Sequence, residues 1–156
     1  MHVLLRRDVR LNVEKSRYMA LGPGARIGES VCYRDAPLPT SLCVRYLGVD
    51  IRAGTRFVCD IEGRLKSFYR AANALLHKSS MVGIARSQDL LFFLYQRYCV
   101  PILRYGYDVM LGCLLRRDEN RMKVAHNSMV RRIYGIDRYD SVPVRFSFAT
   151  CMGLPL

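Results

Sequence analysis

The side chains most suited to chemistry in this sequence are its cations. All but four of the 25 Lys and Arg residues are Arg, and their excess over the 13 Asp and Glu residues gives a formal net charge of +12. The planar guanidinium group of Arg can donate two parallel hydrogen bonds to a phosphate, so such a chain suits a polyanion such as nucleic acid. The alternative is a solvated charged surface in which the abundance of Arg follows the composition of the gene.

Acidic, thiol and imidazole side chains give no comparable pattern. The only adjacent acidic pair is Asp118-Glu119, which lies where the first turn of a helix favours negative charge. The six cysteines contain no Cys-x-x-Cys pair and have no histidine at zinc-ligand spacing, and no Walker, Gly-x-Ser-x-Gly or His-Glu-x-x-His motif occurs. The sequence therefore predicts no metal site, buried free thiols rather than a disulfide scaffold, and no enzyme recognisable by motif.

The first third of the chain has the pattern of short strands separated by loops. Strands are predicted over residues 16–21, more weakly over 28–33, and over 43–51, where apolar and polar residues alternate. A loop is expected around Pro37 and Pro39, and Gly48 is expected at a bend within the last strand.

After Gly54 the apolar period changes from two residues to that of a helix. A first helix is predicted over residues 56–78. Ser87 is the predicted N-cap of a second helix, and Pro101 must kink or break it. The apolar stripe of the first helix consists of Phe57, Ile61, Leu65, Phe68, Ala72 and Leu75.

Two more helices are predicted towards the end of the chain. One begins with Asp118 as its cap and runs to about Tyr134, where Gly135 ends it. A last short helix is expected to start at residues 141–143 and to end at Gly153. The buried residues expected on the longer helix are Met122, Ala125, Met129 and Ile133. Strands followed by helices predict an α+β fold that is mostly α.

No segment has the character of a membrane span or a secretion signal. The most apolar stretch, residues 90–115, contains Arg97, Arg104 and Asp108, which a bilayer would not tolerate. Residues 1–9 are interrupted by two arginines and are too short for a signal peptide. We therefore expect an intracellular protein, cytoplasmic or nuclear, that is not secreted and has no membrane partner.

Three strings occur in a recognisable order: Leu-Asn-Val-Glu-Lys-Ser over residues 11–16, Arg-Tyr-Leu-Gly-Val over 45–49, and Val-Pro-Ile-Leu-Arg-Tyr-Gly over 100–106. Together they resemble the reverse transcriptase encoded by non-LTR retrotransposons of the LINE, jockey and R-element type. The similarity covers the end of the palm and the thumb of that enzyme. Residues 127–135 match a later helix of the family loosely.

The resemblance implies a palm remnant over residues 1–54, with a lysine loop and primer-grip-like strands, and a helical thumb-like region over 55–156 that is truncated at its C-terminus. The family enzyme binds two Mg²⁺ ions on aspartates, including an Asp-Asp pair, and this sequence has no such pair. We therefore expect a fragment of an RNA-directed DNA polymerase that is inactive alone, holds no cofactor, and at most binds template-primer without sequence preference.

The resemblance also assigns site residues. Lys15 matches the palm lysine that acts as general acid towards the pyrophosphate leaving group, a role it could have only in an intact polymerase. Tyr46, Leu47 and Gly48 match the primer grip. The cations expected to contact phosphates of an RNA or DNA backbone are Arg64, Lys66, Arg70, Lys78, Arg131 and Arg132.

Other partners are also expected from the sequence. They are the missing part of the polymerase and a second copy of this chain. An alternative from another class of function is a helical module, used by the host, that binds a protein through the apolar blocks 90–95 and 109–115.

Overall fold

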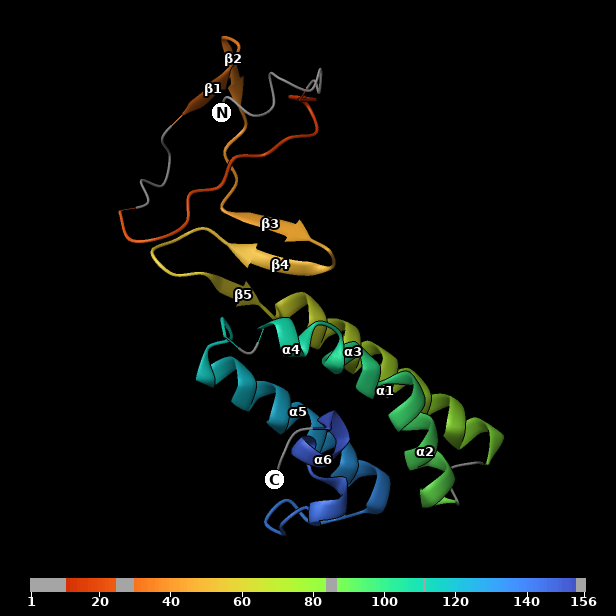
Figure 1. The fold of residues 1–156 in the computed structure, drawn as a ribbon. Helices are drawn as coiled ribbons and strands as arrows, with labels where there is room; N and C mark the ends of the chain where they lie inside the picture. Colours follow the sequence, from red (N-terminus) through yellow and green to blue (C-terminus); the bar gives the residue numbers. More distant parts are fainter. Residues whose placement is uncertain (1–10, 25–29, 84–86, 111, 154–156) are drawn as a thin grey trace. The chain divides into compact units, whose positions relative to one another are not determined.

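The computed structural model describes residues 11–24, 30–83, 87–110 and 112–153. Short strands come first and helices follow, from red to blue in Figure 1. This order confirms the prediction of an α+β fold that is mostly α. The chain divides into a strand unit, Met1–Asp60, and a helical unit, Ile61–Leu156.

The described residues of the strand unit form two small antiparallel sheets. One pairs β1 with β2, and the other has the order β3-β4-β5. The strands are β1 (Val31–Tyr33), β2 (Ala36–Leu38), β3 (Cys43–Tyr46), β4 (Val49–Arg52) and β5 (Val58–Asp60). The weak strand predicted over 28–33 is present as β1, and residues 28 and 29 of that prediction lie outside the described residues.

The single strand predicted over residues 43–51 is wrong, because the chain folds back there as a hairpin. Leu47 and Gly48 form the two-residue turn between β3 and β4, with φ values of 47° and 78°. Positive φ at both turn positions is the geometry of the type I′ turn that joins tight hairpins. The bend expected at Gly48 lies in this turn. Leu47 is not a usual turn residue, so the sequence pattern did not indicate a complete reversal of the chain.

Two further expectations in this unit are also wrong. Pro37 lies inside β2 rather than in a loop, which is tolerated because a two-stranded sheet has only edge strands. Residues 16–21 form no strand: Tyr18 and Leu21 make only isolated parallel bridges. Their partners are far apart in sequence, at Thr40 and Gly54, so neither bridge extends into a ladder.

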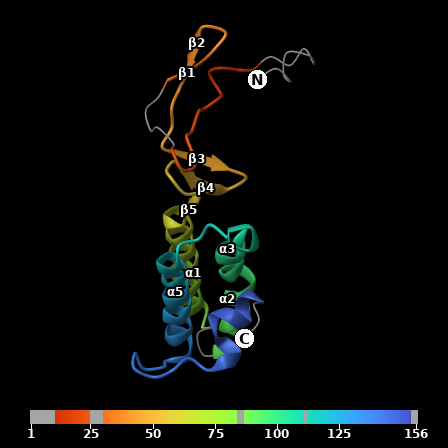
Figure 2. The same cartoon turned by 60° about the vertical axis from the view of Figure 1, so that its left-hand side comes forward.

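The helical unit consists of helices and the segments that connect them (Figure 2). Its described residues form α1 (Glu62–Val82), α2 (Gln88–Tyr98), α3 (Val100–Arg104), α4 (Tyr107–Met110), α5 (Arg116–Tyr134), the 3₁₀ helix η3 (Val144–Phe146) and α6 (Phe148–Met152). The first helix was predicted to begin at residue 56, but β5 occupies its expected first turn. Phe57 is 48% exposed and is not part of the buried stripe. The pairing of β5 with β4 is a tertiary effect that periodicity cannot show.

The boundaries of α2 follow the predicted local signals. Ser87 caps the helix, its Oγ accepting from the backbone N–H of Leu90 at 3.4 Å. The helix ends at Tyr98, and Pro101 lies in the first turn of α3. Proline is tolerated there because the first turn has no intrahelical partner for its backbone nitrogen.

The later helices keep their predicted ends but not their predicted starts. Leu115 rather than Asp118 is the N-cap of α5, so Asp118 lies in the first turn, and Gly135 ends the helix in the left-handed conformation. The last helix was placed too early, because α6 begins after a cap at Ser147. Gly153 ends it as predicted. The four residues expected to be buried on α5 are buried.

A hydrogen-bonded histidine joins three elements in the core of the helical unit. The Tyr95 hydroxyl of α2 lies 2.8 Å from Nδ1 of His126 on α5, and His126 Nε2 lies 2.9 Å from the carbonyl oxygen of Phe146. The carbonyl can only accept, so Nε2 carries the hydrogen and Nδ1 accepts from Tyr95. Both side chains are almost completely buried. Their polar atoms are therefore satisfied without water.

The prediction that no segment spans a membrane can be compared with the helices of the structure. Among the described residues, no helix is long and apolar enough to cross a bilayer.

Candidate nucleic-acid interface

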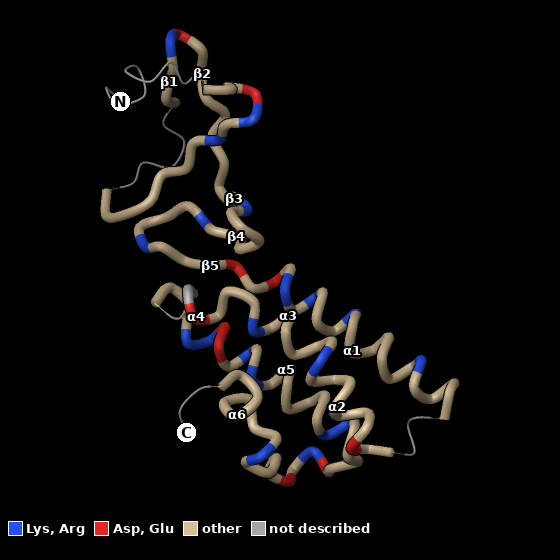
Figure 3. Tube along the Cα trace, turned by 45° about the vertical axis from the view of Figure 1, so that its right-hand side comes forward, with Lys and Arg blue, Asp and Glu red and all other residues tan. Residues whose placement is uncertain are grey.

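The exposed side of α1 carries cations that point away from the core. Leu65, Phe68 and Ala72 form its buried stripe, whereas Lys66 and Arg70 are exposed. A separation of four residues places Lys66 and Arg70 next to each other on one face of the helix. Figure 3 shows α1 with cations along its length.

Two contacts set the register of α5 beside α1. Arg121 on α5 forms an ion pair with Glu62, and Arg132 Nη1 donates to Asn73 Oδ1 at 2.7 Å. Both pairs are separated by the same 59 residues, so the two helices run side by side in the same direction, as Figure 2 shows. This places Arg132 about two helical turns along α1 from Lys66. We call Lys66, Arg70 and Arg132 the basic strip.

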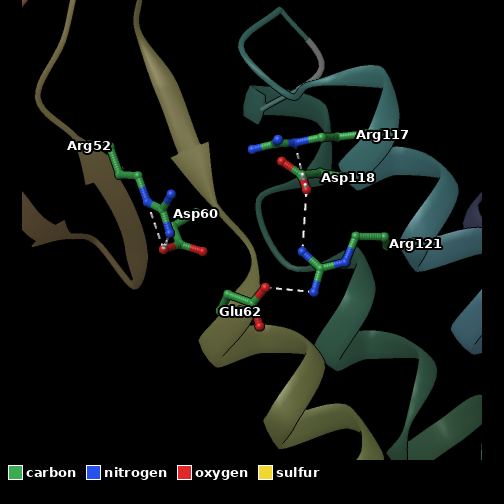
Figure 4. Close-up of polar contacts among 6 residues, drawn as sticks. All are labelled: Arg52, Asp60, Glu62, Arg117, Asp118 and Arg121. Carbon is green, nitrogen blue, oxygen red and sulfur yellow. Dashed lines mark hydrogen bonds and ion pairs between the residues drawn. The ribbon is translucent and has the colours of Figure 1, made fainter.

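The acidic groups near the start of α1 are already neutralised. Arg121 contacts both Glu62 and Asp118, and Arg117 approaches Asp118 at 3.8 Å (Figure 4). The hydrogen bond from Arg121 to Glu62 raises the pKa of the guanidinium, so the Arg121 side chain stays charged. In the strand unit, Arg52 forms a similar pair with Asp60 across neighbouring strands (Figure 4).

The cations on the exposed side of α1 are not neutralised in this way. Glu62 is the only acidic residue of the helix. Within the described part of the chain, Lys66, Arg70 and Lys78 form no ion pair. Arg132 uses one donor on Asn73, and a guanidinium group has five N–H donors. The basic strip therefore combines positive charge with hydrogen-bond donors that can reach a phosphate.

The structure does not place all six predicted phosphate-contacting cations together. Arg64 is half-buried, and its Nη1 donates to the carbonyl oxygen of Leu103 at 3.4 Å. Arg131 is also half-buried and donates to the carbonyl oxygen of Asp140 at 3.0 Å. Lys78 is exposed but lies about a third of a turn around α1 from Lys66. Lys66, Arg70 and Arg132 thus form the compact part of the predicted set.

The predicted lysine loop is a tight turn in the strand unit. Asn12 Oδ1 accepts from the backbone N–H of Lys15 at 3.2 Å, and the Ser16 hydroxyl donates to the carbonyl oxygen of Asn12 at 2.7 Å. The Lys15 side chain is exposed. The spacing of Asn and Ser in this string therefore shapes the turn itself.

The residues matched to a primer grip form the tip of the β3–β4 hairpin. Tyr46 is 64% exposed and Leu47 is 75% exposed, with Gly48 beside them. A left-handed conformation at a residue other than glycine costs roughly 1–2 kcal/mol. Strained positions of this kind cluster at ligand clamps, so the tip is a second surface that can contact a partner.

The described residues offer no fitting site for the Mg²⁺ ions of the resembled enzyme. No group of three His, Cys, Asp or Glu side chains among them lies close enough to hold a metal ion. Sequence reasoning also missed Asn73 and Arg121, because their roles depend on contacts with residues 59 positions away.

Comparisons of the chain with protein-family models, curated proteins and solved structures find no match.

Proposed function

We propose that this chain binds nucleic-acid backbones without reading their sequence, as the palm-end and thumb-like region of a retrotransposon-type RNA-directed DNA polymerase. The observation that carries the binding proposal is the basic strip. In particular, Lys66 and Arg70 are exposed and form no ion pair with any residue that the structure describes. The polymerase relationship is supported by the three ordered strings in the sequence, and the Asn12-Lys15 turn and the exposed hairpin tip are compatible with it.

Phosphate contacts explain why such binding would not depend on sequence. Lys and Arg donors that meet phosphate oxygens position a nucleic acid, whereas sequence is read at the base edges. Lys66 and Arg70 lie on the exposed face of α1, and Arg132 lies beside them on α5, so the three side chains can follow a backbone. We further propose that the chain alone does not transfer nucleotides, since its sequence has no Asp-Asp pair.

Competition binding tests this proposal. A labelled RNA–DNA hybrid bound to the full chain is displaced by unlabelled duplexes of unrelated sequence, and we expect their half-displacing concentrations to agree within about threefold. Displacement by one sequence alone would indicate base readout and contradict the proposal. Absence of binding at low salt would also contradict it and would favour the protein-binding alternative, for which Leu90 and Phe93 are the exposed residues of the block 90–95.

A further inference from the structure

A pocket of about 350 Å³ opens in the helical unit where α2, α3, α4 and α6 meet. Its volume lies at the lower end of the roughly 300–1,000 Å³ that small-molecule sites occupy. The proposed binding of nucleic-acid backbones does not involve the string Pro-Ile-Leu-Arg-Tyr-Gly. This string contributes Pro101, Arg104 and Tyr105 to the wall of the pocket. Gln96, Asp108 and Cys151 are among the other lining residues.

Arg104 and Asp108 are the charged groups of the pocket. Among the described residues, neither Arg104 nor Asp108 forms an ion pair. Arg104 lies against the end of α6, since a Cβ atom at Gly153 would be 3.2 Å from its Nη2. The guanidinium is thus supported on one side and has donors left for a ligand in the pocket.

The composition of the wall indicates what kind of ligand fits. A free phosphate would be repelled by the Asp108 carboxylate, so the pocket differs from an anion site. Burial raises the pKa of the Cys151 thiol, which leaves it a neutral wall group and a poor nucleophile. Tyr105 is 58% exposed and offers an aromatic surface, and Gln96 offers an amide. A neutral planar group with donors and acceptors at its edges suits this wall.

We propose that this pocket holds one unpaired guanine base of a single-stranded segment, a site that rests on the proposed nucleic-acid binding. Arg104 donates to O6 and N7 of the base, the pair of acceptors that Arg recognises on guanine. Asp108 accepts from N1–H and N2–H, and Tyr105 provides a surface for stacking.

Guanine is favoured because, among the common bases, only guanine has two adjacent acceptors, O6 and N7, beside two adjacent donors, N1–H and N2–H. Adenine would turn its N1 acceptor towards the Asp108 carboxylate, and uracil lacks the purine N7 that Arg104 needs. Guanine in a duplex already uses N1–H and N2–H for pairing. The ligand must therefore be unpaired at this base. The basic strip contacts phosphates, which are present in paired and unpaired nucleic acid alike.

Fluorescence anisotropy with short labelled RNAs tests the site. The full chain is titrated with an oligouridylate, with the same RNA carrying one central guanosine, and with the same RNA carrying inosine, which lacks the 2-amino group. We expect the guanosine RNA to bind about tenfold more tightly than the oligouridylate, and inosine to fall between them. Asp108→Asn should remove the guanosine preference without weakening binding to the oligouridylate.

Matched variants separate this site from general charge effects. Glu14→Gln removes the same charge elsewhere and should leave the guanosine preference intact. Arg104→Gln should lower affinity and abolish the preference, whereas Arg138→Gln should lower affinity only. Equal binding of all three RNAs, or a preference that survives Asp108→Asn, would overturn the guanine site and leave the proposed function standing. Absence of binding to every RNA would overturn both.

Discussion

Replacing Lys66 and Arg70 together by Gln is expected to weaken binding to a DNA duplex by roughly 10- to 100-fold at about 0.1 M salt. Each phosphate that a cation neutralises releases counterions, which contributes about 0.9 of a decade in affinity at that salt concentration. Both side chains are exposed and their own contribution to the core is small. Anisotropy titration of wild type and variant measures the ratio of dissociation constants.

A double variant with the same loss of charge is the control. Arg116 and Arg138 are exposed and lie off the basic strip, so Arg116→Gln with Arg138→Gln should weaken binding by no more than about threefold. Equal losses in the two double variants would mean that net charge, rather than the basic strip, determines affinity. That result would contradict the placement of the interface on α1 and α5.

Replacing His126 by Leu is expected to lower the free energy of unfolding by about 2–6 kcal/mol. The change leaves the Tyr95 hydroxyl and the Phe146 carbonyl buried without partners, and each unsatisfied group costs about 1–3 kcal/mol. Both contacts are short, at 2.8 Å and 2.9 Å, and the site is closed to water. Urea denaturation followed by far-UV circular dichroism measures the loss.

A double-mutant cycle shows whether the loss comes from the Tyr95–His126 hydrogen bond. Tyr95→Phe alone leaves His126 Nδ1 without a donor, at a cost of about 1–3 kcal/mol. The double variant should be destabilised by less than the sum of the two single changes, since both remove the same bond. Strict additivity would show that the two side chains do not interact and would contradict the hydrogen bond.

The same histidine predicts how stability depends on pH. Burial lowers the pKa of His126, and the hydrogen bond to the Phe146 carbonyl opposes this only in part. In the unfolded chain the pKa is about 6.5, so below that pH the unfolded state binds a proton that the folded state excludes. The stability contribution is therefore full above about pH 6.5 and is lost as the pH falls below it.

Comparing variants isolates this effect. His126→Leu should remove the part of the pH dependence between pH 5 and pH 7 that comes from this group, and His77→Gln should leave it unchanged because His77 is exposed. A wild-type unfolding free energy that rises on acidification through this range would contradict a buried neutral His126.

Local signals allowed the helical part of the fold to be predicted from sequence. Ser87 and Gly135 act on the backbone of their own helix ends, and the buried side of α5 is determined by residues such as Met129 at helical spacing. A bend was predicted at Gly48, but the complete chain reversal at Leu47 and Gly48 and the strand β5 could not be predicted in this way. Both depend on hydrogen bonds between neighbouring strands, and neither has a distinctive local pattern.

The candidate site, too, could be predicted only where it depends on local sequence and not on contacts between elements. Lys66 and Arg70 were predicted as phosphate contacts from the resemblance, and the structure places both off the buried stripe of their own helix. Their proximity to Arg132 depends on packing between helices that are far apart in sequence. Arg64 has the same charge as Lys66 but reaches the carbonyl of Leu103, a difference that charge and period cannot reveal.

The central claim, sequence-independent binding to phosphates, is tested most directly by measuring affinity against salt concentration for two DNA duplexes of unrelated sequence. Phosphate binding predicts that log affinity falls linearly with log salt, by about 0.9 per phosphate neutralised, and that the two duplexes give the same slope. A flat response, or slopes that differ between the sequences, would contradict the claim.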